Sequence, residues 1–353
     1  MGELKGVEWL WYSPDAGARA ARVLLAPFEL TYGGVVALRG KLYDSGVLPT
    51  RAAQIPALSV GNLTVGGTGK TPISAWLVRE LEKRGAKPAV VLRGYGSDET
   101  LVHRHLNTDA AVVTSGDRAA GIEQAAELGC DVAVLDDAFQ HRRAARTADV
   151  VLISTERWSE RRHLLPAGPW REPLSAIRRA SLVIVTRKSE SADAARGVAA
   201  KIASAARGVR TAIVHLALRE LRSLCRDPDA APLNAIAGRR VLAISAVGDP
   251  RAFEAQLAAL GATVESRAFP DHHRFTAGDV ARLSITAAEL ARDGGDGLPV
   301  VLCTLKDAVK LAPRWPREAP RLWYVSQQPE VESGRAELDA LINRTLAARH
   351  RQP

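Results

Sequence analysis

Short apolar runs alternate with helical patterns along most of this chain. Three of the runs, IPALSVGN (55–62), KPAVVLRGYG (87–96) and CDVAVLDD (130–137), have the length and continuous hydrophobicity of strands buried on both faces. Between the first two, TPISAWLVRELEKRG (71–85) spaces its apolar residues as a helix does and ends on glycine. Further strand-like runs are AAVVTS, ADVVLIST and ASLVIVTR. This alternation predicts an α/β fold with a parallel sheet covered by helices on both faces.

A second series of strands and helices begins at RRVLAISAVGDP (239–250) and ends with LPVVLCTLKD (298–307). Two strand-like pieces lie outside both series, at 211–224 and 321–332. We expect these two pieces to pair as a hinge between two domains. The last helix, at about 333–349, would then return to the first domain.

The composition is that of a globular protein of 353 residues, with 46% hydrophobic and 25% charged residues. This length allows two domains, each with a core. The net charge of +9 suits nucleotides, nucleic acid or an anionic membrane face, and the charge alone does not choose among them. Three scattered cysteines, Cys130, Cys225 and Cys303, form no zinc motif and predict free, buried thiols in a reducing compartment.

The N-terminal segment has an unusual pattern. Acidic residues stand where a signal peptide would be basic. Trp9, Trp11 and Tyr12 precede an apolar stretch, Val23–Leu38, which Pro27 and a glycine pair interrupt. The stretch is shorter than the roughly 20 residues that a spanning helix needs, and basic residues flank it. The pattern favours a segment that lies on a membrane surface, and a helix docked on the protein's own core is the alternative.

The stretch VGNLTVGGTGKTP (60–72) joins the first strand to the first helix. It supplies glycines whose N–H groups can face an anion, a lysine that can reach terminal phosphates, and a hydroxyl that can hold Mg²⁺. The general phosphate-loop pattern places a glycine where Thr64 stands here. The strand–loop–helix order still predicts a nucleotide site, with these residues: Thr64, Gly66, Gly67, Thr68, Gly69, Lys70 and Thr71.

A carboxylate that ends a neighbouring buried strand commonly holds Mg²⁺ in such a site, directly or through water. Asp136 and Asp137 end the strand-like run CDVAVLDD. We therefore expect Thr71, Asp136 and Asp137 to form the metal site. The alternative is a pair of aspartates that caps the following turn.

Six stretches, in this order, resemble the tetraacyldisaccharide 4'-kinase family, the lipid A 4'-kinases: VGNLTVGGTGKTP, RGYG, LDDAFQHRR, LPAGPWREP, FPDHHRF and TLKDAVK. The resemblance spans essentially the whole chain, and Thr64 belongs to this family's own form of the loop. It implies transfer of the γ-phosphoryl group of ATP, with Mg²⁺, to the 4'-hydroxyl of a tetraacyl glucosamine disaccharide 1-phosphate. The product would be lipid IVA, a precursor of lipid A.

The resemblance also implies two α/β/α sandwich domains, a P-loop NTPase-like parallel sheet and a smaller second α/β domain, with the cleft between them. The boundaries that we predict are 1–50 for an amphipathic membrane-associating segment, 51–224 for the P-loop kinase domain, 225–322 for the second domain, and 323–353 for the hinge strand and returning helix.

Catalytic roles follow from the same resemblance. Asp98 matches the family's catalytic base, His272 matches the histidine that pairs with this base, and Lys70 would bind the β- and γ-phosphates. We expect the Asp98–His272 pair to form only when the cleft closes. The family usually has a longer insertion before its Asp-Glu pair, whereas SDET (97–100) follows RGYG at once, and it usually has Gly at the position of Ala138.

Further site residues are expected from the same motifs. The candidates for substrate contact are Asn62, Glu99, His141 and Arg171. Asn62 is also a candidate brace for the loop, and Arg171 could instead pack on Trp170. Asp98 with Glu99 could be solvated turn residues, His272 could be structural, and Lys306 and Asp307 of TLKD have no expected role.

The expected partners are the lipid disaccharide and a membrane surface, with no nucleic acid and a monomeric chain. The expected location is the cytoplasmic face of the bacterial inner membrane. A second hypothesis is a membrane-associated P-loop ATPase switch that has no small-molecule acceptor.

Overall fold

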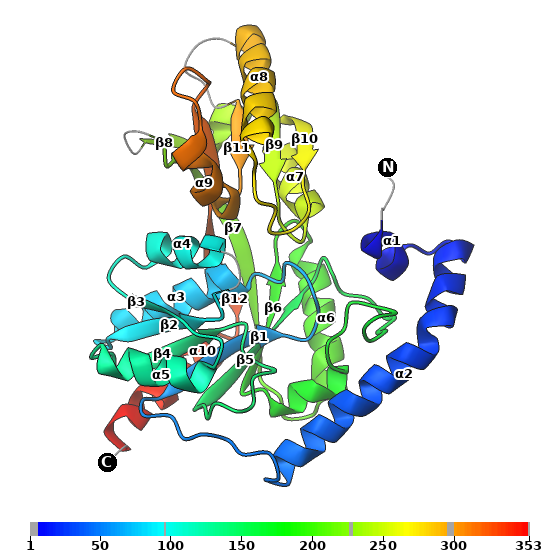
Figure 1. The fold of residues 1–353 in the computed structure, drawn as a ribbon, viewed down its shortest axis with the longest axis vertical. Helices are drawn as coiled ribbons and strands as arrows, with labels where there is room; N and C mark the ends of the chain where they lie inside the picture. Colours follow the sequence, from blue (N-terminus) through cyan, green and yellow to red (C-terminus); the bar gives the residue numbers. More distant parts are fainter. Residues whose placement is uncertain (1–5, 95–96, 226–228, 295–299, 352–353) are drawn as a thin grey trace.

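The computed structural model describes residues 6–94, 97–225, 229–294 and 300–351. Figure 1 shows two lobes, one above the other, with a long helix beside the lower lobe. The described residues include a 12-stranded sheet in the order β10-β9-β11-β12-β7-β6-β5-β1-β4-β2-β3, and β8 pairs with β7. Tyr95 and Gly96 of the RGYG motif lie outside the described residues, as do residues 1–5 of the predicted N-terminal segment.

The lower lobe is built on parallel strands, as the apolar runs predict. Its strands are β1 (Ala57–Asn62), β2 (Pro88–Leu92), β3 (Ala111–Thr114), β4 (Val132–Asp136), β5 (Ala148–Ser154) and β6 (Leu182–Arg187). Its helices are α3 (Lys70–Glu82), α4 (Ser97–Leu106), α5 (Arg118–Glu127) and α6 (Ala192–Ala205), with a 3₁₀ turn η1 (Leu174–Arg179).

The upper lobe continues the same sheet. Its strands are β8 (Asp229–Pro232), β9 (Arg240–Ser245), β10 (Thr263–Ala268) and β11 (Val301–Cys303). Its helices are α7 (Pro250–Ala259), α8 (Ala277–Gly294) and α9 (Leu305–Leu311), with 3₁₀ turns η2 (Leu233–Ile236) and η3 (Ala312–Arg314).

Two long strands connect the lobes. β7 (Thr211–Ser223) and β12 (Leu322–Ser333) pair antiparallel, β7 continues the sheet to β6, and β12 continues it to β11. Helix α10 (Arg335–Ala347) then packs Leu338 and Ile342 into the core of the lower lobe, and η4 (Ala348–Arg351) follows. The two strand-like pieces at 211–224 and 321–332 thus pair with each other, and the last helix packs on the lower lobe; their role as a hinge stays a prediction.

The predicted α/β class is confirmed, and the structure adds that the lobes share one continuous sheet. Separate apolar clusters fill the two lobes. The exact boundaries at 50, 224 and 322 stay a prediction. Of the three cysteines, Cys303 is fully buried while Cys130 and Cys225 are half-buried, so the expectation of core cysteines holds for Cys303 alone.

The N-terminal segment forms α1 (Val7–Tyr12) and α2 (Ala16–Asp44). The expectation that this stretch is too short to span a membrane is wrong, because α2 runs for 29 residues through Pro27 and the glycine pair. It is long and apolar enough to cross a membrane by length and composition, which is weak evidence for a single helix. Only 6% of its apolar window is buried, so docking on the protein's core, the alternative, does not describe it. Figure 1 shows α2 running along the outside of the lower lobe.

Candidate active site

The phosphate loop lies between β1 and α3, where the sequence predicts it. Gly69 has a positive φ of 86°, and a Cβ there would lie 2.4 Å from Cδ1 of Leu216, so only glycine fits. Asn62 is buried beneath the loop and donates to Oγ1 of Thr68 at 3.0 Å. Thr186 on β6 donates to the carbonyl oxygen of Thr68 at 2.9 Å. This burial favours Asn62 as a brace over a substrate contact.

The loop opens onto a cavity of about 1290 Å³ between the lobes. Of the predicted nucleotide residues, Gly66 to Thr71 line this cavity. Thr64 is not among its described lining residues: its backbone pairs with Trp170. The backbone of Thr64 therefore supports the loop, and its expected contact with the nucleotide stays a prediction.

Asp136 ends β4 and is fully enclosed by donors. Its Oδ1 accepts from Oγ of Ser74 and from the N–H of Asp137, both at 3.0 Å, and its Oδ2 lies 2.9 Å from Nε2 of His103. Burial alone would raise the pKa of Asp136, but the contact with His103 and the charge of Lys70 outweigh it and lower the pKa. Asp136 is therefore ionised and already saturated with hydrogen bonds.

Asp137 is the more open carboxylate. It has a positive φ of 50°, its side chain is 36% exposed, and its Oδ1 lies 3.7 Å from Nζ of Lys70 and 3.2 Å from the guanidinium of Arg171. Burial works against its charge, but Lys70 and Arg171 lower its pKa. Arg171 therefore forms an ion pair with Asp137, which the alternative of packing on Trp170 does not explain.

These residues fit a magnesium ion of the kind that P-loop proteins bind. No group of three or more His, Cys, Asp or Glu within the described ranges could hold a metal by itself. Mg²⁺ bound with a nucleotide needs only one or two protein oxygens, because phosphate and water supply the rest. Thr71 and the open carboxylate of Asp137 are suitable direct ligands, whereas the saturated Asp136 is suited to contact through water.

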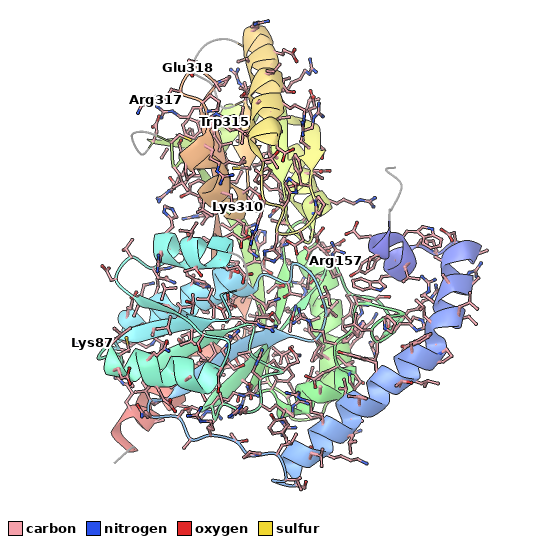
Figure 2. The ribbon with its side chains drawn as sticks, in the orientation of Figure 1. Lys87, Arg157, Lys310, Trp315, Arg317 and Glu318 are labelled. Carbon is pink, nitrogen blue, oxygen red and sulfur yellow. The ribbon has the colours of Figure 1, made fainter. Side chains whose placement is uncertain are left out.

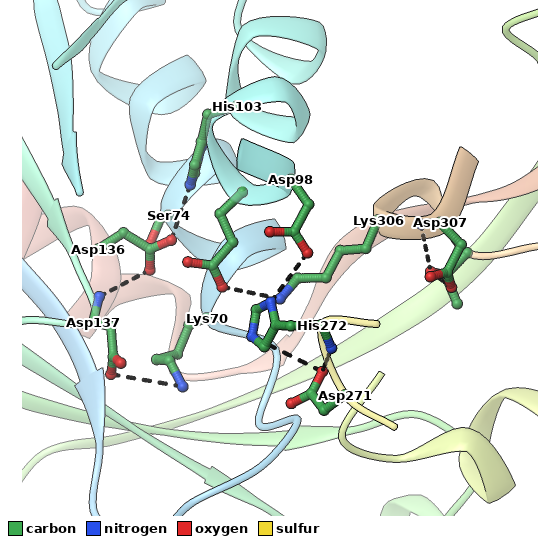
Figure 3. A network of polar contacts seen from close by, with 12 residues as sticks. Lys70, Ser74, Asp98, His103, Asp136, Asp137, Asp271, His272, Lys306 and Asp307 are labelled. Atoms are coloured by element: carbon green, nitrogen blue, oxygen red, sulfur yellow. Dashed lines mark hydrogen bonds and ion pairs between the residues drawn. The ribbon is translucent and has the colours of Figure 1, made fainter. Parts of the chain in front are cut away.

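Asp98 and His272 meet across the cleft, as Figure 3 shows. Nδ1 of His272, a residue of the upper lobe, lies 3.0 Å from Oδ2 of Asp98 at the start of α4. Asp98 is buried, so the alternative of a solvated turn is wrong, and its Oδ1 has no hydrogen-bond partner in the described structure. His273 lies away from Asp98 and contacts Asp279 at 3.1 Å. The lobes are therefore arranged with the predicted pair already formed.

The pKa values of this pair move apart. Burial works to raise the pKa of Asp98, but the hydrogen bond and charge of His272, with Lys306 and Lys310, hold it at about 2. The hydrogen bond to Asp98 raises the pKa of His272 above 6.5. Asp98 is thus a carboxylate at neutral pH, and the protonated form of His272 is favoured.

The TLKDAVK motif, whose role the sequence left open, faces α4 from the upper lobe. Nζ of Lys306 lies 3.0 Å from Oε1 of Glu99, and Nζ of Lys310 lies 3.8 Å from Oδ2 of Asp98. Asp307 is buried beneath them, where it pairs with Lys310 at 3.2 Å. Helix α9 therefore supplies the cations that meet both acidic residues of α4.

His141 and Glu99 also line the cavity, as expected of residues near the substrate. Burial, followed by the charges of Arg118 and Arg93, lowers the pKa of His141 to about 4, so its imidazole is neutral at pH 7. Neutral imidazole can donate or accept a hydrogen bond without adding charge.

Sequence reasoning missed four residues of the site. They are Ser74 and His103, which bind Asp136, Lys188, whose Nζ donates to the carbonyl oxygen of Gly67 at 3.1 Å, and Lys310. Lys188 could have been found, because it follows β6 and the carboxyl ends of parallel strands meet at one edge. His103 could not, because its role depends on a helix that the sequence pattern did not predict.

The upper lobe also covers the phosphate loop. A Cβ at Gly248 would lie only 3.0 Å from the N atom of Gly67, so the two backbones are in close contact. Arg157, labelled in Figure 2, donates to the carbonyl oxygen of Gly248 and lies 3.4 Å from both Asp249 and Glu8 of α1. The lobes, the loop and the N-terminal segment therefore meet at this point.

Comparison with known proteins shows the family of this chain. The family described as Tetraacyldisaccharide-1-P 4'-kinase matches residues 21–347. Relatives named "Tetraacyldisaccharide 4'-kinase" are 37% identical in Anaeromyxobacter dehalogenans, over 98% of this chain and 96% of the relative, and 36% identical in Azoarcus sp., over 92% of each. A crystal structure of LpxK from Aquifex aeolicus in complex with ATP has a TM-score of 0.70 and 28% identity, and covers 92% of this chain and 99% of that one. The chain belongs to the tetraacyldisaccharide 4'-kinase family.

Proposed function

We propose that this protein transfers the γ-phosphoryl group of ATP to the 4'-hydroxyl of a tetraacyl glucosamine disaccharide 1-phosphate and so forms lipid IVA. The observation that carries the proposal is the Asp98–His272 pair, at 3.0 Å, in which His272 lines the same cavity as the phosphate loop. A base held beside the cavity that contains a nucleotide loop is what phosphoryl transfer to a hydroxyl requires.

The phosphate loop and Lys70 bind and orient the ATP phosphates. Asp98 accepts the proton of the 4'-hydroxyl on its unpaired Oδ1, while His272 fixes Oδ2. Asp98 itself does not line the cavity in the described structure, so the lobes must part to admit the sugar hydroxyl to it. Closure then excludes water from the transferring group.

A magnesium ion, when bound, neutralises charge on the β- and γ-phosphates. Thr71 and Asp137 would contact it, and Asp136 would hold its water. Arg171, Glu99 and His141 lie at the same cavity and are proposed to contact the sugar or its anionic group.

The exposed apolar side chains of α2 favour contact with a membrane surface. Leu24 and Leu30 are each 76% exposed, and Phe28 is 64% exposed. An acylated substrate resides in a bilayer, so a kinase that binds there meets it directly. We propose the cytoplasmic face of the bacterial inner membrane, where ATP is available, and a monomeric chain.

The direct test is transfer of labelled phosphate from ATP to the lipid disaccharide in detergent micelles. The unmodified protein should label the lipid, and Lys70→Ala should reduce the rate by at least about 100-fold. Lys87→Ala is the matched control, because Lys87 is exposed and lies away from the cleft (Figure 2). An unmodified protein that hydrolyses ATP and never labels lipid would support the ATPase switch instead.

Asp98→Asn separates the two functions further. The variant should lose about 10²- to 10⁴-fold in kcat for lipid phosphorylation, since the carboxylate that takes the proton is gone. Its affinity for ATP, measured by calorimetry, should stay within about threefold, because Asp98 lies outside the phosphate loop. Undiminished lipid phosphorylation would refute Asp98 as the base.

A further inference from the structure

Lys306 is the one residue of the TLKDAVK motif whose charge lies at the wall of the cavity beside the base. Its side chain lines the same cavity as Lys70, Lys188 and Gly67, and it reaches that cavity from α9 of the upper lobe. Figure 3 shows its side chain extending from α9 toward His272. The motif therefore brings a cation from the second lobe to the place where phosphate would lie.

The hydrogen bonds of Lys306 leave donors free. In the described part of the chain, its Nζ donates to Oε1 of Glu99 at 3.0 Å, and an ammonium carries three N–H donors. Lys310 differs, since its Nζ contacts Asp307 at 3.2 Å and the carbonyl oxygen of His273 at 3.3 Å, and also lies over the ring of Phe275. Lys306 thus has capacity for another acceptor, whereas Lys310 is held in place by its own lobe.

The charge of Lys306 is secure. Burial opposes an ammonium ion, but Glu99 and the nearby Asp271 and Asp98 outweigh it and raise the pKa of Lys306. The charge of Lys306 lowers the pKa of both Asp98 and Lys188. Lys188 belongs to the loop side of the site, since its Nζ donates to the carbonyl oxygen of Gly67. A permanent cation from the upper lobe therefore lines the cavity that also contains the phosphate loop.

We propose that Lys306 is a catalytic residue of the upper lobe, which donates to the transferring phosphoryl group when the cleft is closed. Glu99 orients the amine and leaves two of its donors to the phosphoryl oxygens. The inference rests on the phosphoryl transfer proposed above.

The step balances as an in-line displacement. The bond from the γ-phosphorus to the β,γ-bridging oxygen breaks and its electron pair leaves with ADP. The sugar 4'-oxygen forms the new bond to phosphorus, and its proton passes to Oδ1 of Asp98. Lys306 remains an ammonium ion throughout and neither gains nor loses a proton. Its contribution is electrostatic stabilisation of charge on the equatorial oxygens.

The test compares Lys306→Met with Lys306→Arg in the full-length protein. Lys306→Met should reduce kcat for lipid phosphorylation by about 10²- to 10³-fold with the KM for ATP within about threefold, because the contact is made mainly in the transition state. Lys306→Arg keeps the charge and should recover at least about tenfold of the loss. Lys87→Met, on the far side of the lower lobe, is the matched control and should match the unmodified protein (Figure 2).

A binding readout separates catalysis from a structural latch. Lys306→Met should bind ADP normally but bind ADP with aluminium fluoride, a mimic of the transferring group, at least about 30-fold more weakly than the unmodified protein. Equal weakening of both ligands, or a kcat within about threefold of normal, would overturn the proposal. Failure of the unmodified protein to phosphorylate lipid would instead count against the proposed function, since the aluminium fluoride comparison needs no lipid.

Discussion

At the scale of single residues, Asp98 combines burial with a strongly acidic carboxyl group. A pKa of about 2 makes Asp98 a weak base in the ground state. Phosphoryl transfer tolerates this, because its loose transition state leaves most of the proton transfer until the new bond has formed. The surrounding side chains of His272, Lys306 and Lys310 therefore serve to keep the carboxylate ionised and fixed.

The ion pair between His272 and Asp98 predicts a pH dependence of stability. The raised pKa of His272 means that its contribution is fully present below 6.5 and is lost as the pH rises through the higher folded value. The lowered pKa of Asp98 means that its contribution is present above 3.8 and is lost as the pH falls toward 2. The pair therefore stabilises the folded chain most between about pH 4 and 6.5.

Removing the imidazole should lower the stability of the fold mainly within this pH range. We expect His272→Asn to lower the Tm by about 1–3 °C at pH 6, a small effect because the side chain is 43% exposed and solvent screens the pair. The difference should shrink by pH 9. Circular dichroism melts across this range measure it, and a pH-independent difference would contradict the ion pair.

At the scale of elements, strands such as β1, β2 and β4 were predictable because each is a continuous apolar run in the interior of the sheet, whereas the short, exposed strand β8 was not. The hinge pair of β7 and β12 was also predictable, since both lie outside the two βα series. Comparison with relatives confirms the kinase function and ATP as the nucleotide. The roles of single site residues stay predictions.

Two helices could not be read correctly from local pattern. Helix α4 is SDETLVHRHL, whose polar residues suggest a loop, yet Val102 and His103 are buried and α9 packs against its outer side. Its conformation depends on those tertiary contacts. Helix α2 is longer than the apolar stretch Val23–Leu38 from which it was predicted, because it runs from Ala16 through Pro27 to Asp44. It is tied to the lower lobe at points such as Tyr32, whose hydroxyl donates to the carbonyl oxygen of Arg171 at 3.0 Å.

Within the segment expected to contact a membrane, the structure distinguishes the aromatic residues of α1 from the apolar side chains of α2. Trp11 donates to the carbonyl oxygen of Pro166 at 3.0 Å, and Tyr12 packs against Arg157, so these aromatic residues are engaged with the protein itself. The exposed apolar side chains belong instead to α2, among them Leu24 and Leu30. They are the residues whose burial in a bilayer would stabilise binding.

We therefore expect the double variant Leu24→Glu/Leu30→Glu to partition into liposomes at least about tenfold less than the unmodified protein. Each leucine contributes about 1.5–3 kcal/mol when fully buried, and a carboxylate is costly to bury. Co-sedimentation with anionic liposomes measures the change. Leu128→Glu, at a site 66% exposed beyond α5, is the matched control, and equal partition of all three proteins would refute membrane contact through α2.

At the scale of the whole molecule, one sheet joins two lobes that must also move relative to each other. The hinge strands are continuous with both halves, so motion concentrates where the lobes touch without sharing strands. Three such contacts meet the site: His272 with Asp98, Lys306 with Glu99, and Gly248 with Gly67. The first two are polar and adjustable, whereas the third is a backbone contact that requires the absence of a side chain.

Gly248→Ala should therefore impair closure while the fold persists. The new Cβ would lie 3.0 Å from the N atom of Gly67 and 3.2 Å from Oδ2 of Asp271, and the lobes can relieve these contacts by separating slightly. A displacement of this size should lower kcat/KM by about 10- to 100-fold. Steady-state kinetics measure the loss, and small-angle scattering with ATP bound should show a less compact molecule. Gly197→Ala, in an exposed position of α6 where a Cβ meets nothing within 4 Å, controls for the substitution itself. Normal kinetics in Gly248→Ala would mean that catalysis does not require this backbone contact.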